Sequence, residues 1–166
     1  MVRIKYVVTA AVLLIAGILV AVYLSQSEEK RVKKQFDSLS EWVSKDADET
    51  AFTMARKTQN IGTLFTESCE FKAPFYSLSG SYTPDDISSY AAQARLGFSR
   101  VSLHFYDLDI DFLEKTSAKV MVTGRLKGES KGGERLDEVR EVHCVMKKID
   151  NTWLFNEIEV IEVLKK

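Results

Sequence analysis

The sequence has few cysteines, few histidines and no large excess of charge of one sign, and each shortage excludes a class of function. Its 166 residues include two Cys and two His. Cys69 and Cys144 have no neighbouring Cys or His at metal-ligand spacing, so a zinc site is not indicated. Setting aside Arg3 and Lys5 from the 23 basic residues leaves 21 against 24 acidic ones, about minus three. This mild acidity argues against nucleic-acid binding.

The two cysteines could form a disulfide if the domain lies in an oxidising compartment. Cys69 and Cys144 each fall at an apolar position of a predicted strand. Two buried, unpaired thiols are the simpler interpretation. A disulfide needs Cα atoms within about 7 Å of each other, and spacing along the chain does not report that distance.

Long uncharged runs are absent except for one, at residues 6–24. At ~1.5 Å rise per residue this run spans about 28 Å as a helix, close to the ~30 Å of bilayer hydrocarbon. Tyr6 and Tyr23 lie at its ends, where aromatic residues favour the headgroup layer. We therefore predict a short tail at residues 1–5, a single-pass transmembrane anchor at residues 6–24, and a soluble domain at residues 28–166.

A cleaved secretory signal is the alternative to an anchor. Arg3 and Lys5 would supply its basic start, but the apolar run exceeds the usual length of about 7 to 15 residues. The run ends in Val22, Tyr23 and Leu24 rather than in small residues, so we favour an uncleaved signal-anchor. Basic residues lie on both sides of the run and barely set its orientation. A short tail before a large domain favours an inner (cell) membrane location with a periplasmic or extracellular domain.

The first half of the predicted domain has helical periodicity. Apolar residues recur at three- and four-residue steps in 28–45, and a second helix is expected from Asp48 or Thr50 through Phe65, with Phe52 on its buried stripe. Alternation at residues 69–73 predicts a strand, and residues 76–82 are expected to form a loop. Thr83 and Pro84 are typical of a helix start, and Gly97 would end that helix.

From residue 101 onward, period-two alternation predicts an antiparallel meander of four strands. The apolar phase slips near Tyr106 and Asp107, and again after Phe155, which indicates two β-bulges. Residues 127–134 are expected to form a long polar turn, and Asp150-Asn151 a tight one. The whole pattern predicts an α+β domain with three helices and a bent antiparallel sheet.

This order of elements resembles the nuclear transport factor 2-like superfamily, the cystatin-like α+β cone, over residues 28–163. The resemblance rests on Trp153-Leu154-Phe155 after a tight turn, the bulged strand at 101–112, and Thr83-Pro84-Asp85-Asp86 opening the third helix. None of these is a functional motif. The superfamily includes ketosteroid isomerase, scytalone dehydratase, SnoaL-like polyketide cyclases, transport factors and periplasmic assembly subunits of type IV secretion systems. The last are similar in having one N-terminal membrane helix, but fold does not fix activity.

The resemblance implies a site inside the cone, where isomerase and dehydratase relatives place an acid or histidine base beside tyrosines. His104 and His143 alternate against apolar neighbours and should face outward, so no catalytic residue is predicted. The best candidates for a pocket rim flank the third helix: Tyr76, Tyr82, Tyr90, Gln93 and Arg95. Asp107, Asp109 and Asp111 share one strand side, which is typical of a solvated face rather than a calcium site. No metal or cofactor is expected.

The leading hypothesis is a membrane-anchored, non-catalytic binding or assembly domain with a protein partner. The alternative is a ketosteroid-isomerase-like or polyketide-cyclase-like enzyme, or a carrier of a small lipophilic ligand. By resemblance, a homodimer through the sheet face is also expected. A third interpretation gives the basic stretch from Lys30 to Lys34 a role in holding the first helix against anionic headgroups, although a solvated helix start explains the same charges.

Overall fold

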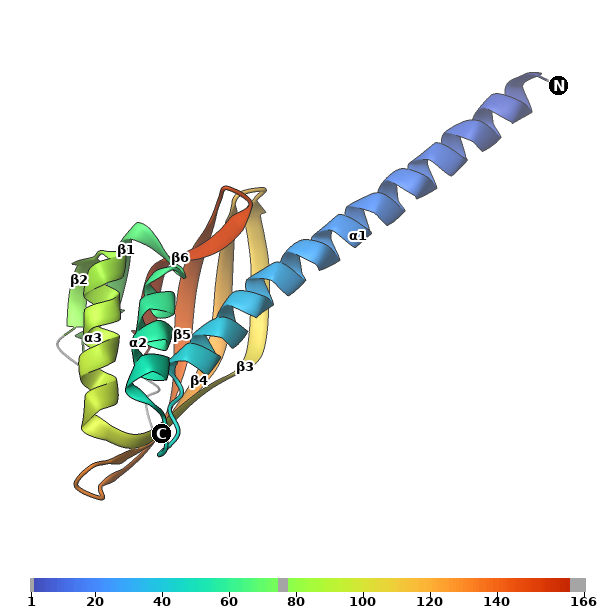
Figure 1. Ribbon diagram of the computed structural model, residues 1–166. Coiled ribbons are helices and arrows are strands. Elements are labelled where there is room, and N and C mark those ends of the chain that lie inside the picture. Colours follow the sequence, from blue (N-terminus) through green and yellow to red (C-terminus); the bar gives the residue numbers. More distant parts are fainter. Residues whose placement is uncertain (1, 75–77, 162–166) are drawn as a thin grey trace. The chain divides into compact units, whose positions relative to one another are not determined.

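The computed structural model describes residues 2–74 and 78–161 and shows helices together with one mixed sheet (Figure 1). Contacts divide the chain into two compact units, Met1–Val32 and Lys33–Lys166. The elements are, in order, α1 (Val2–Val43), α2 (Ala51–Gly62), β1 (Phe65–Ala73), β2 (Leu78–Tyr82), α3 (Pro84–Gly97), β3 (Phe98–Glu114), β4 (Ser117–Ser130), β5 (Arg135–Ile149) and β6 (Thr152–Ile161). The predicted α+β class is confirmed.

The first unit consists of the N-terminal part of α1. Its large apolar side chains between residues 12 and 20 are each more than half exposed, as is that of Tyr23. The side chain of Tyr6 lies outside the described residues. Within the described chain, no helix meets the length and apolarity required of a membrane span. The predicted anchor at residues 6–24 has no support from that finding.

In the second unit the helix starts are set by the predicted caps. The Thr50 hydroxyl accepts a hydrogen bond from the Thr53 N–H at 3.2 Å, and Thr83 forms a capping box with Asp86 ahead of Pro84. Each cap satisfies backbone donors that the first helical turn leaves free. The predicted end of the second helix was wrong, because α2 stops at Gly62 and Phe65 already belongs to β1.

The sheet has six strands in the order β2-β1-β6-β5-β4-β3. The four-strand meander is confirmed as β3 to β6, and β1 lies parallel to β6 with Phe71 opposite Ile158. Residues 78–82, expected to be a loop, instead form β2 and pair antiparallel with β1. The first half of the long turn expected at 127–134 is also strand, because β4 continues to Ser130, and this leaves a tight connection that contains Gly133 at φ 86°.

The phase slips in the sequence are confirmed as register shifts in the sheet. One lies between Tyr106 and Asp109, where Asp107 has φ 54°. The other lies where β5 shifts register against β6, between Val145 and Met146. Asp150 and Asn151 form the tight turn before β6 with φ 47° and 64°. These shifts bend the strands, as bulges do.

The core of the second unit is aromatic at its centre. The Phe36 ring meets those of Phe105 and Phe155 edge to face, at centroid distances of 5.2 and 5.0 Å. Trp153 is 1% exposed and Phe155 is fully buried. Phe52 was predicted to lie in this core and does not, since 77% of it is exposed on α2.

Both cysteines are free and buried. Cys69 lies on β1 and Cys144 on β5, with β6 between them, so their Cα atoms are separated by two strand spacings, roughly 9.5 Å. That exceeds the ~7 Å that a disulfide spans. Burial raises the pKa of the Cys69 thiol to about 12 and raises that of Cys144 as well. Neither thiol is poised to react.

Candidate functional site

The cavity that best fits a ligand lies between the helices and the sheet of the second unit. Its volume is about 320 Å³, which is at the lower end of the range for small-molecule sites. It is lined by side chains from α1, α2, α3 and four strands: Leu39, Val43, Ile61, Phe65, Phe71, Leu78, Tyr82, Ile87, Tyr90, Ala91, Ala94, Leu103 and Ile158. We call it the apolar cavity.

Aromatic side chains form one wall of the apolar cavity. Tyr82 packs edge to face against Phe71 and against Tyr90, with centroids 5.6 Å apart in both pairs. The α3 wall presents Ala91 and Ala94, whose small side chains leave space that larger residues would fill. Among the described lining residues there is no carboxylate, imidazole, amine or guanidinium. The cavity therefore offers apolar surface and the edges of two tyrosines.

The structure separates the five predicted rim residues. Tyr82 and Tyr90 line the apolar cavity, and Tyr90 is 52% exposed. Gln93 lies on the exposed side of α3 and does not line the cavity. Arg95 is 3% exposed and points away from the cavity into a cluster of charges. Tyr76 lies outside the described residues.

Sequence analysis missed most of the lining side chains. Leu39 and Val43 were on the predicted stripe of the first helix, and Ile87, Ala91 and Ala94 recur at helical spacing on the third. That spacing signals one apolar face of a helix, but it does not show whether partner side chains fill the space opposite. The small side chains of Ala91 and Ala94 were the one signal in the sequence that this space could be left unfilled.

Arg95 joins the C-terminal end of α1 to the end of α3. Its Nη1 donates to the carbonyl oxygens of Trp42, at 2.6 Å, and Ser44, at 3.0 Å, and also contacts that of Val43. Its Nη2 forms an ion pair with Glu49. The last carbonyls of a helix have no partner within it and carry partial negative charge, so a guanidinium is well placed here.

Lys45 makes the reciprocal connection. Its Nζ donates to the carbonyl oxygens of Arg95 at 2.9 Å and Phe98 at 2.6 Å, at the end of α3. Its backbone pairs with Val101 of β3. Each helix end is thus held by a cation from beside the other. We call Lys45, Glu49, Lys57 and Arg95 the helix-end network.

Glu49 is the anion of the helix-end network. Its side chain is 4% exposed, and Oε1 lies 3.1 Å from Lys57 Nζ. Burial is the largest effect on its pKa and acts to raise it, but hydrogen bonds and charges from Arg95 and Lys57 together outweigh burial. The pKa of Glu49 is therefore lowered below 4.5, its ordinary value, and the carboxylate stays ionised at neutral pH.

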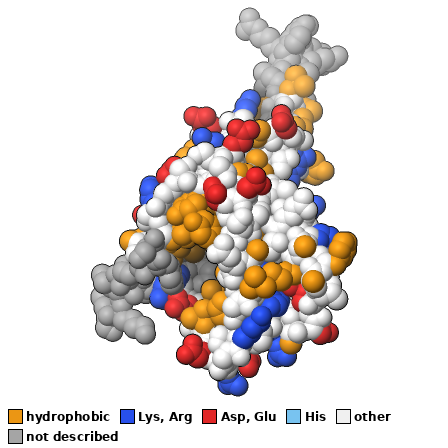
Figure 2. Space-filling view, turned by 60° about the vertical axis from the view of Figure 1, so that its left-hand side comes forward, with side chains coloured by type: hydrophobic (Ala, Val, Ile, Leu, Met, Phe, Trp, Pro, Cys, Tyr) orange, Lys and Arg blue, Asp and Glu red, His pale blue; other side chains and the backbone are white. Residues whose placement is uncertain are grey.

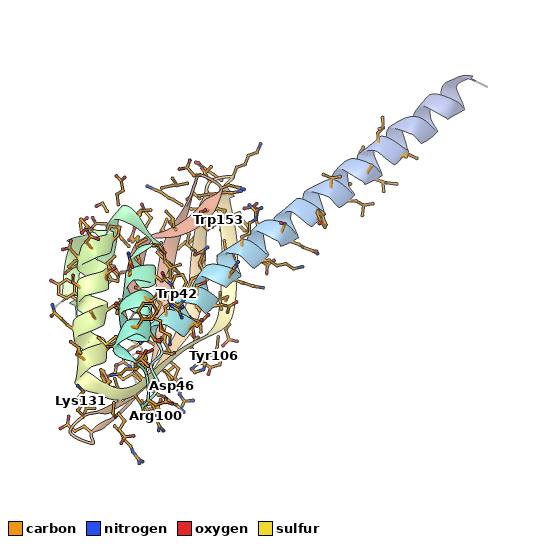
Figure 3. The ribbon with its side chains drawn as sticks, viewed as in Figure 1. Trp42, Asp46, Arg100, Tyr106, Lys131 and Trp153 are labelled. Atoms are coloured by element: carbon orange, nitrogen blue, oxygen red, sulfur yellow. The ribbon has the colours of Figure 1, made fainter. Side chains whose placement is uncertain are left out.

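A second hollow, of about 570 Å³, lies where the residues after α1 meet β3, β4 and β5. Figure 3 labels two of its lining residues, Asp46 and Arg100, toward the end of the sheet opposite Trp153. Lys127 and Asp137 also line it, and Asp137 accepts two hydrogen bonds from Arg125, at 2.8 and 2.9 Å. Charges of both signs face this hollow, so it selects neither an anion nor a cation.

The remaining ionisable candidates lie away from the apolar cavity. His104 is exposed and stacks on Tyr106, and His143 pairs with Glu141 at 2.7 Å. The outward direction predicted for both histidines is confirmed. Asp107, Asp109 and Asp111 are exposed on β3, and the described residues contain no group of three side chains arranged as metal ligands.

Comparison with known proteins finds no matching family model and no matching curated protein. Solved structures do match. A protein of Novosphingobium aromaticivorans described as a scytalone dehydratase has a TM-score of 0.68 at 20% identity, over 84% of this chain and 87% of that one. The hexachlorocyclohexane dehydrochlorinase LinA type 2 has a TM-score of 0.67 at 10% identity, over 82% and 86%. Kfla4162 from Kribbella flavida gives 0.67 at 9% identity, over 82% and 90%.

The chain has the nuclear transport factor 2-like fold. Identities of 20% and below show the fold alone.

In this nuclear transport factor 2-like chain, the described lining of the apolar cavity carries no acid or base beside its tyrosines. The interior of the cone thus differs from the arrangement that the resemblance to isomerases and dehydratases implied.

Proposed function

We propose that the second unit is a non-catalytic binding domain that takes an aliphatic group of a lipophilic molecule into the apolar cavity. The observation that carries the proposal is an accessible volume of about 320 Å³ whose described lining is apolar apart from Tyr82 and Tyr90. An aliphatic chain gains about 0.8 kcal/mol for each methylene removed from water. A charged substrate would find no partner among these residues to offset its desolvation.

We further propose that residues 6–24 anchor the domain to a cell membrane, with the domain outside. The uncharged run of the sequence supports this proposal. The exposed apolar side chains between residues 12 and 20 support it too, because a helix that is apolar all round needs a partner or a bilayer. A domain held at a membrane would lie close to the bilayer, where lipophilic molecules concentrate. A protein partner that delivers the ligand to the domain, or accepts it from the domain, is consistent with this function.

The test is binding of straight-chain alkanols, from hexanol to decanol, to the fragment 28–166 by calorimetry. This fragment contains the whole second unit with its sheet, core and cavity. We expect each added methylene to tighten binding about fourfold until the cavity is full. Native mass spectrometry of the same fragment, purified without added ligand, would identify a retained molecule by its mass.

Matched variants assign the binding to the apolar cavity. Ala91→Leu places a larger side chain in the cavity, whereas Gln93→Leu places the same side chain on the exposed side of α3. We expect the first to weaken binding of decanol at least tenfold and the second to leave it unchanged. Equal affinities for all alkanols, or equal binding by both variants, would contradict the proposal. Turnover of a bound molecule that Tyr90→Phe abolishes would favour an enzyme instead.

A further inference from the structure

β3 forms one edge of the six-stranded sheet and, with 17 residues, is the longest strand of the described chain. Figure 1 shows it on the side of the sheet away from β1 and β2. It pairs with β4 along one side. An edge strand leaves a row of backbone N–H and C=O groups on its other side, and a further strand can pair with these groups.

The chain itself pairs with the first part of this edge. The backbone of Lys45 exchanges two hydrogen bonds with Val101, at 2.7 and 3.1 Å. The Leu103 N–H donates to the Ser44 hydroxyl at 3.1 Å, and the Leu103 carbonyl oxygen accepts from the Ser40 hydroxyl. The segment from Ser40 to Lys45 therefore covers the edge as far as Leu103.

Beyond the bulge the edge has no such partner. Three steps along β3, from Tyr106 to Asp109, correspond to two steps along β4, so the bulge adds one residue to β3. Ile110 and Phe112 therefore direct their N–H and C=O groups to the same edge as Val101 does. Among the residues that the structure describes, no backbone hydrogen bond reaches that side of Ile110 or Phe112.

Residues 107–113 of β3, which we call the acidic edge, present apolar side chains on the inner face of the sheet. Ile110 and Phe112 are half-buried there, and the Phe112 ring centroid lies 5.7 Å from that of Trp153. Apolar side chains on a neighbouring strand would bury more of Ile110 and Phe112, because residues directly opposite on adjacent strands are in contact.

The outer face of the acidic edge carries three exposed carboxylates, Asp107, Asp109 and Asp111. Lys119 of β4 lies across from Asp111 in the register, but within the described chain none of the three forms a salt bridge. Opposite charges attract across adjacent strands, and like charges repel. The edge therefore favours a strand with Lys or Arg at alternate positions. Two copies paired through this edge would set aspartates against aspartates, which disfavours self-pairing.

The opposite edge of the sheet, formed by β2, is different in kind. β2 has five residues, Leu78–Tyr82, and includes Gly80 at φ 150°. None of these five residues is charged. Figure 2 views the molecule from the α3 and β2 side, where hydrophobic side chains form separate patches among charges of both signs. A long backbone edge with a row of carboxylates is thus a property of β3.

We propose that the acidic edge binds an extended segment of a partner protein in which basic and apolar residues alternate. The segment would add a further strand to the sheet, with hydrogen bonds to the backbone of Ile110 and Phe112. Its apolar side chains would extend the inner face, and its Lys or Arg side chains would lie beside Asp109 and Asp111. Backbone pairing gives such a complex its affinity, and the alternate side chains give it specificity.

The first test is binding of a fluorescent peptide to the full chain in nonionic detergent, measured by anisotropy. The peptide has Lys and Val at alternate positions and is as long as the acidic edge. A peptide of the same composition, with its lysines gathered at one end, is the matched control. We expect the alternating peptide to bind at least tenfold more tightly, because only this order places every charge on the acidic face. Equal affinities would overturn the proposal.

Methylation of the peptide's main-chain nitrogens tests backbone pairing without altering the protein. Methyl groups on the Val nitrogens block the N–H groups on one side of the strand, and methyl groups on the Lys nitrogens block those on the other. Only one side of an added strand faces β3. One methylated peptide should therefore bind as the parent does, and the other should bind at least tenfold more weakly. Two methylated peptides that bind alike would overturn strand addition.

Charge reversal on the protein tests the role of the carboxylates. Asp109→Lys combined with Asp111→Lys should weaken binding of the Lys/Val peptide at least tenfold and create binding of an alternating Glu/Val peptide. Asp85→Lys combined with Glu134→Lys changes the net charge equally at exposed positions elsewhere, and should leave the binding of both peptides unchanged. Circular dichroism should show both double variants folded, since all four positions are exposed. Binding of the Lys/Val peptide that survives the reversal at 109 and 111 would overturn the proposal.

Discussion

The apolar cavity and the helix-end network are adjacent and chemically opposite. Val43 and Ala94 line the cavity, whereas Ser44 and Arg95, the next residues along each segment, belong to the polar contacts around the network. Successive residues of a helix point about 100° apart, so neighbours in sequence can serve different surroundings. The comparison teaches that the buried charged side chains bind backbone carbonyl oxygens at the helix ends. The described lining of the cavity beside them contains no charged side chain.

Loss of the guanidinium should have the largest effect on the network. Arg95→Met would leave Glu49 buried without its main partner and the end of α1 without its cation, so we expect a loss of about 3–5 kcal/mol in the free energy of unfolding. Urea denaturation of the fragment 28–166 measures it. Arg95→Lys keeps the charge but not the planar fork, and should lose less. A loss below about 1 kcal/mol for Arg95→Met would show that solvent replaces these contacts.

Moving a carboxylate into the cavity should invert the behaviour of Glu49. Ile87 is 8% exposed and lines the cavity without a cation among its described neighbours there. Ile87→Glu should therefore have a raised pKa and lose about 2–4 kcal/mol at pH 7. The loss should shrink as pH falls and the carboxyl becomes neutral. Urea denaturation at pH 4.5 and pH 7, with Ile87→Gln as the uncharged control, distinguishes the charge from the change of shape.

The wild-type Glu49 should show the opposite dependence on pH. Its pKa in the folded state lies below the ordinary value of 4.5, so the unfolded chain takes up its proton first as pH falls. The stabilisation is complete above the ordinary pKa and is lost as pH drops through the lowered one. Glu49→Gln should be less stable than wild type at pH 7, and the difference should narrow between pH 5 and pH 3. A constant difference over this range would contradict the assignment.

Removing Lys45 Nζ should have the smallest effect of the four. Lys45→Met keeps the aliphatic stem and the backbone pairing with Val101, and removes only the cation at the end of α3. A cation at a helix C-terminus is worth about 0.3–2 kcal/mol, depending on burial. We expect a loss in that range by urea denaturation, together with faster amide exchange in the last turn of α3. Unchanged exchange there would mean that other groups secure this turn.

The elements predicted well are those specified by neighbouring residues. Alternation in β3 to β6, the bulge at Asp107 and the cap at Thr83 are all local signals, and the structure confirms them. β2 was missed because Ser79, Gly80 and Ser81 have little intrinsic preference for a strand, and the pairing comes from β1. A distant partner overrode the local signal.

The site was harder to predict than the fold because it depends on the space that side chains leave unfilled between the helices and the sheet. Tyr82 and Tyr90 were identified from their place beside the third helix. Arg95 was misplaced because sequence spacing does not reveal that the carbonyls at the end of α1 lie within its reach. Phe52 fitted a helical stripe, but the described residues leave 77% of it exposed. Periodicity identifies a face, while the structure identifies its partner.

The position of β6 has a consequence for how the chain is made. This strand, close to the end of the chain, lies between β1 and β5, and it joins residues as far apart as Phe65 and Phe155. Until residues 152–161 have been synthesised, β1 and β5 each have an open edge, which is a surface prone to pairing with other chains. Chains that are cut short before β6 should therefore aggregate rather than remain as a smaller folded sheet.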